Sequence, residues 1–563
     1  MSACKGLFWL LVDGLSHTLW QQLAPRLPVR IDCVVPLEPL SPNCQTPPSL
    51  FSIWSGLDAS AHELTGYEIP DPQAGDPLAV ADAFGRWPRT TAMVWDRWAA
   101  AGGRIRASAV PFVQPARLAG ALLSHTEVYA PLVSAPAVLA PGEVLSVPAL
   151  RLACRLSVSA DGRAMVLHEV PMGGDLRIPF GSTAHVALSA ALPAAVAGDT
   201  NRAVAVRAAL VEGEPRLCFL GFQPVFVHGR DAALRRLALR HRACSVGNSA
   251  RLHAAGALGR HVDQGGDGAA ELLLLDLLDV MHRSFLDDIL WSLRAGEAEL
   301  IVGYYPVIDL VSHQLLRHLQ PSATATPAQL AVADAIRARL ARWLFELFDG
   351  CAALLAPGCR FVAHSDHGMQ PLTHDLAPNR CFAQRGWLAL DDAGQIDPAR
   401  SMVFYHPAEN GWLALHPARM ASAGVTAQAL VEALDAALPP ELAKGFRLIE
   451  GPVVELDGGW RSPWYLQPPT ASRLLKSPRL PFAAPSRKGG DHTCWSDAPW
   501  LKGVLLEPAW QSGAAPWRTP LTLMDLAPAL MAHLARPAQA ATAPTPVSAS
   551  ASASAQVKAQ AWH

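Results

Sequence analysis

The chain has 563 residues, of which 50% are hydrophobic and 17% are charged, so it has ample apolar material for a core and its bulk is not intrinsically disordered. Forty-six basic and forty-eight acidic side chains give a formal net charge of −2, which argues against coating a nucleic-acid polymer, because such proteins carry a basic excess. The mean hydropathy of +0.17 is raised largely by alanine. No uninterrupted apolar run reaches the roughly 18 residues needed to cross a membrane.

An apolar run at residues 6–12 ends directly in Asp13. A secretory signal peptide would continue into small residues and a cleavage site, whereas here Asp13, Gly14 and His17 follow. The run is more typical of a buried parallel strand that delivers a carboxylate at its carboxyl end. Without a targeting signal, the expected compartment is the cytoplasm.

The ten cysteines are spread along the chain without a CxxC pair. This spacing predicts neither a disulfide framework nor a structural zinc site, and most of these thiols are expected to be small buried hydrophobes. The tail over residues 537–563 is rich in alanine, serine and proline, a composition typical of disorder.

Strands and helices are expected to alternate over residues 1–135 and again from 266 to 536. This rhythm predicts an α/β fold with a doubly wound, mainly parallel sheet. The expected strands are 7–12, 92–94, 104–110, 299–305 and 360–364, and the expected helices open near 50–54 or cover 96–101, 271–293, 327–347 and 521–534.

Between these two parts, residues 136–265 have a different rhythm. Four short strand-like runs, at 149–157, 164–170, 203–210 and 216–222, are separated by turns that contain glycine and aspartate. We expect an inserted β-rich cap subdomain there, within a single large catalytic domain.

Several acids, imidazoles and one hydroxyl fall just beyond expected strands or in loops, where doubly wound folds collect their ligands. Each has a plainer explanation when taken alone: an aspartate after a strand is commonly a helix N-cap, and a pair at i, i+4 is commonly a surface pair. Together they form the donor set of a two-metal site. The residues are Asp13, Thr46, Asp309, His313, Asp366, His367 and His492.

Four segments in the same order resemble the alkaline phosphatase superfamily, and within it the type I phosphodiesterase/nucleotide pyrophosphatase group. Residues 46–56 (TPPSLFSIWSG), followed by His62, are similar to the family's nucleophile block. The pair Asp309/His313, the run 365–369 (SDHGM) and the run 490–492 (GDH) are similar to its metal segments. The stretches 382–392 and 519–530 also resemble the family. The resemblance leaves out the 136–265 insert and the tail.

The resemblance implies a phosphoric ester hydrolase with two divalent metal ions and a covalent phospho-threonine intermediate. Asp309, His313 and His492 would hold one metal. Asp13, Asp366 and His367 would hold the other, together with Thr46 as the nucleophile. Imidazole and carboxylate donors suit zinc, and manganese is compatible with the carboxylates. The implied partner is a small anionic phosphate ester, and no prediction of oligomeric state follows.

One position departs from the family pattern. Where relatives usually place an asparagine amide against the phosphoryl oxygens, this chain has Tyr67, whose phenol donates one hydrogen bond. Tyr67 is therefore the predicted substrate contact. Arg487 and Lys488 are candidates for a phosphate clamp, although a solvated basic pair is the plainer interpretation. Tyr304, Trp54 and the tryptophans at 460, 464 and 495 could stack on a leaving group or simply pack in the core.

Three other functions are compatible with these motifs. Phosphonate C–P cleavage and phosphomutase chemistry use a similar metal core, and a catalytically inactive binding protein could retain the fold. Sulfatase activity is disfavoured, because Thr46 cannot be converted to the formylglycine that sulfatases use.

Overall fold

The computed structural model describes residues 6–534, with gaps at 30, 172, 190–191, 194, 196–197, 199–202, 240–248, 321, 357–358, 443, 509–516 and 518. The expected tail at 537–563, Cys4 and Cys244 lie outside the described residues. The eight cysteines inside them are free thiols, and all but Cys33 are buried. Among the described helices, none has the length and apolar character needed to cross a membrane.

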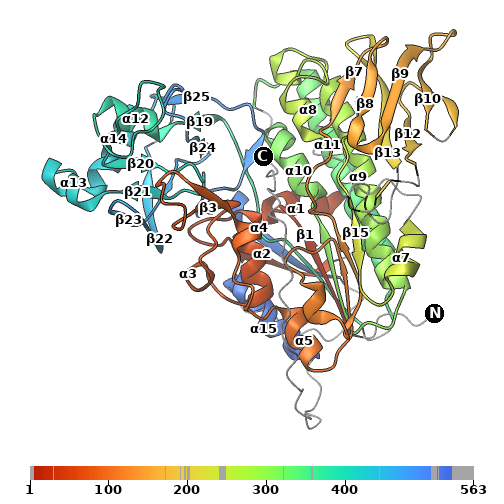
Figure 1. Ribbon diagram of the computed structural model, residues 1–563, viewed down its shortest axis with the longest axis horizontal. Coiled ribbons are helices and arrows are strands. Elements are labelled where there is room, and N and C mark those ends of the chain that lie inside the picture. The colour runs from red at the N-terminus through yellow and green to blue at the C-terminus, as the bar shows by residue number, and fades with distance from the viewer. Residues whose placement is uncertain are drawn as a thin grey trace.

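A nine-stranded mixed sheet forms the centre of the molecule (Figure 1). From edge to edge its strands are β15 (Phe226–His228), β6 (Leu122–Glu127), β5 (Ile105–Ser108), β16 (Leu300–Tyr305), β1 (Leu7–Val12), β17 (Arg360–His364), β27 (Gly503–Pro508), β2 (Ile31–Glu38) and β28 (Leu521–Thr522). The five strands from β6 to β17 run parallel, as do β2 and β28. The pairs β15–β6, β17–β27 and β27–β2 are antiparallel. The predicted mixed α/β architecture with a mainly parallel sheet is confirmed.

Helices cover both faces of this sheet. On one side, α9 (Ala269–Arg294) packs on β16 and β5, and α11 (Pro327–Ala352) packs on α9. On the other side, α15 (Leu523–Leu534) contacts β1 and α2 (Thr46–Ser55), and α5 (Val94–Ala100) contacts β5. The helix α1 (His17–Leu23) contacts β2, β27 and α11. Because β1 is covered on both faces, all six of its residues are buried, which explains its uninterrupted apolar sequence.

The expected strand at 92–94 is wrong. Met93 is the N-cap of α5, and the Asp96 side chain accepts a hydrogen bond of 2.9 Å from the Met93 backbone N–H. This cap starts a helix at Val94 in spite of the apolar, strand-like residues there. Other expected elements are confirmed: β16, β17, α9 and α11 lie within a few residues of their predicted ranges.

Two four-stranded antiparallel sheets occupy much of the 136–265 range and share their own buried apolar cluster (Figure 1). One contains β8 (Val144–Val147), β9 (Leu152–Val158), β10 (Ala164–Val170) and β11 (Gly174–Pro179), and the other contains β7 (Ala137–Leu139), β12 (Thr183–Ala187), β13 (Ala203–Val211) and β14 (Glu214–Phe219). The chain rejoins the main sheet at β15, inside the range assigned to the insert. The helices α7 (Ala232–Leu239) and α8 (Ala250–Ala254) follow.

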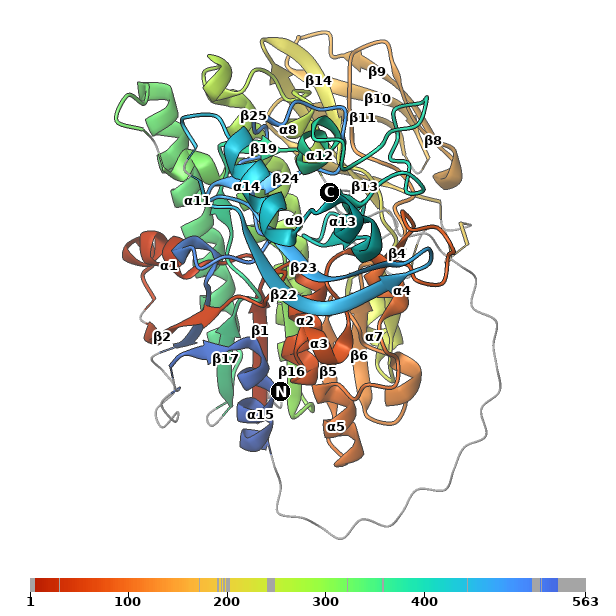
Figure 2. The ribbon, with the colours of Figure 1, turned by 90° about the vertical axis from the view of Figure 1, so that its left-hand side faces the viewer.

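A second lobe with its own apolar core lies over residues 370–491, where the sequence pattern is less regular. Its elements are β18 (Gln370–Pro371), β19 (His374–Leu376), α12 (Pro378–Gln384), β20 (Val403–Tyr405), β21 (Leu413–Leu415), α13 (Pro417–Ala423), α14 (Ala427–Ala437), β22 (Arg447–Leu456), β23 (Trp460–Gln467), β24 (Ser472–Leu474), β25 (Ala483–Pro485) and β26 (Gly490–Asp491). Figure 2 shows the long β22–β23 hairpin lying across the front of α2 and of α3 (Ala59–His62), and β22 contacts α3.

Candidate active site

The seven metal and nucleophile residues predicted from the sequence converge at the carboxyl ends of the central strands. Asp13 follows β1, and Thr46 is the first residue of α2. The helix α10 (Val307–Leu315), which follows β16, carries both Asp309 and His313 on one face. Asp366 and His367 follow β17, and His492 follows β26. All of them except His313 are buried.

Each of the three histidines uses its Nδ1 atom in the same way. A backbone carbonyl only accepts, so an Nδ1 atom bonded to one must carry the ring proton, and the lone pair is then on Nε2. This arrangement is typical of metal-ligating histidines, whose outer nitrogen is tied to an acceptor. The bonds run from His313 to the Gly490 carbonyl (3.1 Å), from His367 to the Gly368 carbonyl (2.9 Å) and from His492 to the Cys44 carbonyl (3.1 Å).

Asp309, His313 and His492 form the first candidate metal group. The Nε2 atoms of His313 and His492 are 3.2 Å apart. Asp309 Oδ2 lies 3.5 Å from His313 Nε2, and Asp309 Oδ1 lies 3.6 Å from His492 Nε2. Two lone pairs that face each other cannot form a hydrogen bond, whereas both can bind one cation. Two imidazoles and a carboxylate are a donor set that suits zinc.

The second group surrounds His367. Its Nε2 atom lies 3.3 Å from Asp13 Oδ1, 3.3 Å from Asp366 Oδ2 and 3.2 Å from the Thr46 hydroxyl. The ligand atoms of Asp13, Asp309 and His367 also lie within 4.8 Å of one another. Asp309 is thus within reach of both groups, whereas the sequence assigned it to the first group alone.

The surroundings of the three carboxylates suit a bound cation better than they suit three neighbouring negative charges. Asp13 Oδ1, Asp309 Oδ1 and Asp366 Oδ2 are buried without a hydrogen-bond partner among the described residues. Burial raises the pKa of Asp13 and of Asp309 well above the ordinary value, and it raises the pKa of Asp366 to about 7. Leaving one buried polar atom unpaired costs about 1 to 3 kcal/mol, and more when the group is charged. A divalent cation would satisfy these oxygens and favour their ionised form.

Thr46 begins α2, so its side chain lies at the positive end of the helix dipole, which favours negative charge on its oxygen. The Tyr67 side chain is hydrogen-bonded to that of Thr46. Burial and the nearby Asp13 and Asp309 raise the pKa of Tyr67, so its phenol keeps its proton and remains a donor. The Tyr67 backbone N–H donates to Gln45 Oε1 at 2.7 Å, which fixes the loop beside the hydroxyl. Tyr67 thus lies beside Thr46, and its role as a substrate contact stays a prediction.

Other residues singled out in the sequence have the following surroundings. His62 Nε2 lies 2.9 Å from the Ser52 hydroxyl on α2, and burial lowers the pKa of His62 to about 4. Lys488 Nζ lies 3.7 Å from Asp491 Oδ1. Trp54 and Trp460 are fully buried in the cores of the main domain and the second lobe.

Two phenols lie beside the site. The sequence singled out only Tyr304, as a residue that could stack on a leaving group or pack in the core, and it did not single out Tyr129. The Tyr304 hydroxyl donates a short hydrogen bond to Asp13 Oδ2, and Tyr129 is hydrogen-bonded to Tyr304. Neither tyrosine belongs to a motif with readable spacing. The only sequence signal is that Tyr304 is near the end of a buried strand next to the one that delivers Asp13.

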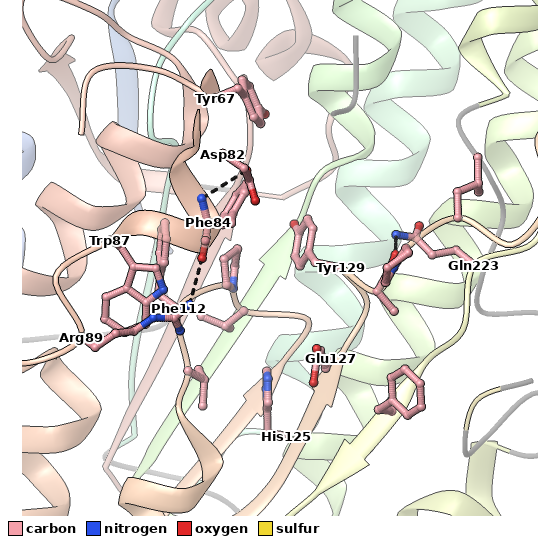
Figure 3. Close-up of a pocket in the computed structure, with 18 of the residues that line it drawn as sticks. Tyr67, Asp82, Phe84, Trp87, Arg89, Phe112, His125, Glu127, Tyr129 and Gln223 are labelled. Atoms are coloured by element: carbon pink, nitrogen blue, oxygen red, sulfur yellow. Dashed lines mark hydrogen bonds between the residues drawn. The ribbon is translucent and has the colours of Figure 1, made fainter. Parts of the chain in front are cut away.

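A cavity of about 440 Å³ opens beside this group of phenols (Figure 3). Phe84, Trp87 and Phe112 form an aromatic wall, and Tyr67 and Tyr129 lie along the edge nearest the site. Its polar lining consists of Asp82, Arg89, His125, Glu127, Gln223 and Arg251. Because Tyr67 both lines the cavity and bonds to Thr46, the cavity adjoins Thr46.

His125 lies at the base of this cavity (Figure 3). It is 3% exposed, and its Nδ1 atom has no hydrogen-bond partner among the described residues. Burial lowers its pKa to about 3, so the ring is neutral at physiological pH.

Residues 257–462 match the family model "Type I phosphodiesterase / nucleotide pyrophosphatase". The match includes Asp309, His313, Asp366 and His367, and it confirms the resemblance found in the sequence. No curated protein matches the chain.

Three solved structures are similar to most of the chain. Murine ectonucleotide pyrophosphatase/phosphodiesterase 5 is 10% identical, with a TM-score of 0.39 and coverage of 94% of both chains. The human protein of that name is 11% identical, with a TM-score of 0.41 and coverage of 95% of this chain and 97% of that one. Phosphonoacetate hydrolase from Sinorhizobium meliloti 1021, in complex with phosphonoformate, is 14% identical, with a TM-score of 0.42 and coverage of 94% and 96%.

Proposed function

We propose that this chain is a type I phosphodiesterase/nucleotide pyrophosphatase-like phosphoric ester hydrolase, which the family match over residues 257–462 supports. It would cleave small anionic phosphate esters with two divalent metal ions and a phospho-threonine intermediate. The observation that carries the proposal is the meeting of three Nε2 lone pairs, three unpaired carboxylate oxygens and the Thr46 hydroxyl in one buried place. Such an arrangement is costly in a protein that binds no cation.

Asp309, His313 and His492 would hold one metal, and Asp13, Asp366 and His367 would hold the other, with Asp309 within reach of both. Zinc is the ion we propose, because imidazole donors predominate at the first group, and manganese is the alternative. When bound, the two ions supply positive charge that attracts the phosphate and favours loss of the threonine proton.

The protein's own residues then account for the rest of the reaction. The Thr46 oxygen attacks phosphorus and the bond from phosphorus to the leaving oxygen breaks, so the phosphoryl group is transferred to threonine and the alcohol departs after gaining a proton. Water next attacks the phospho-threonine, which releases phosphate, or a phosphomonoester from a diester, and restores the hydroxyl. The α2 N-terminus and the Tyr67 phenol stabilise negative charge that develops on the oxygens beside Thr46.

The cavity next to Tyr67 is suited to an organic substituent of the ester. Its aromatic wall offers stacking surface, and the neutral His125 ring offers an acceptor to an N–H or O–H group at the base. We therefore propose that esters with an aromatic substituent are better substrates than esters of small aliphatic alcohols.

The first prediction concerns Thr46. A panel of p-nitrophenyl phosphate, bis(p-nitrophenyl) phosphate and phosphonoacetate, assayed with zinc or manganese, should show hydrolysis of at least one aryl ester. Thr46→Ala should lower kcat by roughly a thousandfold or more, because it removes the attacking oxygen. Thr46→Ser, which keeps a hydroxyl, is the matched control and should retain most of the activity.

Full activity in Thr46→Ala would refute the assignment of the nucleophile. A metal-loaded wild type that is inactive on every aryl ester would refute the hydrolase proposal. Phosphate release from phosphonoacetate alone would point to phosphonate C–P cleavage.

A further inference from the structure

The two oxygens of the Asp13 carboxylate have different surroundings. Oδ2 accepts the hydrogen bond from the Tyr304 hydroxyl. Oδ1 has no hydrogen-bond partner among the described residues and lies 3.3 Å from His367 Nε2. One oxygen is therefore occupied by the protein, and the other faces the metal group.

Tyr304 is rigidly held with respect to Asp13. Its strand β16 pairs in parallel with β1, with Tyr304 opposite Leu11, and the Asp13 backbone N–H donates to the Tyr305 carbonyl at 3.0 Å. The Tyr304 side chain is 3% exposed, so solvent does not compete for its hydroxyl. Backbone and side chain together fix the carboxylate in one orientation.

A second tyrosine, Tyr129, lies beside Tyr304. A phenol has a single proton, and the Tyr304 proton is given to Asp13. The Tyr129 side chain is hydrogen-bonded to the same tyrosine, Tyr304. The ring centroids of Tyr129 and Tyr304 are 6.0 Å apart, and Tyr129 lies at the edge of the aromatic cavity.

We propose that Tyr304, held in turn by Tyr129, is a positioning residue that keeps Asp13 Oδ2 occupied and directs Oδ1 toward the metal centre. This inference rests on the proposed metal-dependent function. Without the phenol, the Asp13 carboxylate is free to rotate, and metal binding then costs the conformational entropy lost when this carboxylate is fixed.

The chain offers a matched control in the next residue. Tyr305 is fully buried on the same strand, and its hydroxyl lies 2.8 Å from His282 Nδ1 instead of contacting a site residue. Tyr305→Phe and Tyr304→Phe thus remove the same atom from neighbouring buried positions. Only the second substitution touches the environment of Asp13.

The experiment is a zinc titration of the full-length, metal-stripped protein against a chromogenic chelator, read together with thermal unfolding. Tyr304→Phe should weaken one of the two zinc sites by about 10- to 100-fold, the usual effect of losing a partner of a metal ligand. Tyr129→Phe should weaken the same site by less. Tyr305→Phe should lower the melting temperature without changing either zinc affinity.

The inference is overturned if both zinc affinities of Tyr304→Phe stay within twofold of the wild type, or if Tyr305→Phe weakens zinc binding as much. It also fails if the wild type binds no zinc. A wild type that binds zinc but cleaves no phosphate ester overturns the proposed function while leaving the role of Tyr304 intact.

Discussion

Three influences act on the single side-chain oxygen of Thr46. The helix α2 places its positive end there, the Tyr67 side chain bonds to the hydroxyl, and His367 Nε2 lies 3.2 Å away. Each favours electron density on an oxygen that is otherwise a poor nucleophile at neutral pH. Pro47 and Pro48, which follow at once, have no N–H to donate, so the Tyr67 phenol gains importance as a donor at this end of the helix.

Tyr67→Phe should therefore lower kcat by about 10- to 100-fold, because one preorganised donor to the developing negative charge is lost. The melting temperature should change little, since the ring is kept and continues to pack near Phe84, 6.3 Å away between centroids. Steady-state kinetics of the metal-loaded variant on the best ester of the panel would measure the effect. A kcat within twofold of the wild type would contradict the assigned role.

At the scale of elements, the end of β1 and the start of α10 approach so closely that only a glycine fits between them. A Cβ atom on Gly14 would lie 2.8 Å from Asp309 Cα and 3.0 Å from Asp309 Oδ1, and Gly14 has a φ of +69°. Its backbone N–H lies 3.3 Å from Asp366 Oδ1, to which it donates. Gly14 thus lies against the carboxylates of Asp309 and Asp366 and directly follows Asp13 in the chain.

Gly14→Ala should destabilise the protein by about 1 to 3 kcal/mol through left-handed strain and should also weaken metal binding, because Asp309 must move. Gly56→Ala is a matched control: its φ is +76°, but a Cβ there would have no neighbour closer than 3.8 Å. Chemical denaturation of both variants measures the cost of backbone strain. Zinc titration of both variants measures the effect of displacing Asp309. Equal zinc affinities in the two variants would argue against a close-approach role for Gly14.

The sequence predicted the strands and acidic residues at the candidate site better than it predicted the neighbouring side chains that hold them in place. β1 and β17 were found because strands buried on both faces have uninterrupted apolar sequences, and the acids just beyond them could be identified by position. The helix α5 was misread because its apolar start resembles a strand and a capping interaction decided otherwise. The hydrogen bonds of Tyr304 to Asp13 and Tyr129 could not be predicted, because a hydrogen bond between side chains depends on tertiary packing and leaves no spacing in the sequence.

For the whole molecule, the site is a junction of segments from residue 13 to residue 492 that crosses from the main sheet to the second lobe. Burying its carboxylates raises the pKa of Asp366 to about 7, above the ordinary value of 3.8. Between these two pH values, the metal-free folded protein keeps a proton that the unfolded chain has lost, so this group's contribution to stability falls as pH rises toward 7. A bound cation displaces the proton and removes this loss.

Metal removal should therefore lower the melting temperature, and the difference between metal-loaded and metal-free protein should grow from pH 5.5 to pH 7.5 as protons cease to compete for the carboxylates. Differential scanning calorimetry with and without a chelator, at constant ionic strength, would measure this. Asp366→Asn, which cannot titrate, should flatten the pH dependence. A difference that shrinks over this range would contradict the assignment of Asp366.

Asp13 directly follows β1, whereas His492 comes near the end of the described residues, so the order of synthesis matters. A ribosome must extend the chain past His492 before the first metal group has all of its donors, although the main sheet already holds β1, β16 and β17 by residue 364. Domains fold while they are being synthesised, yet this candidate site is complete only when the segment that contains His492 has been added and folded. Under the proposed assignment, loading of the first metal group would be a late step in the maturation of the protein, because an interrupted translation product that ends before His492 would lack one of its imidazoles.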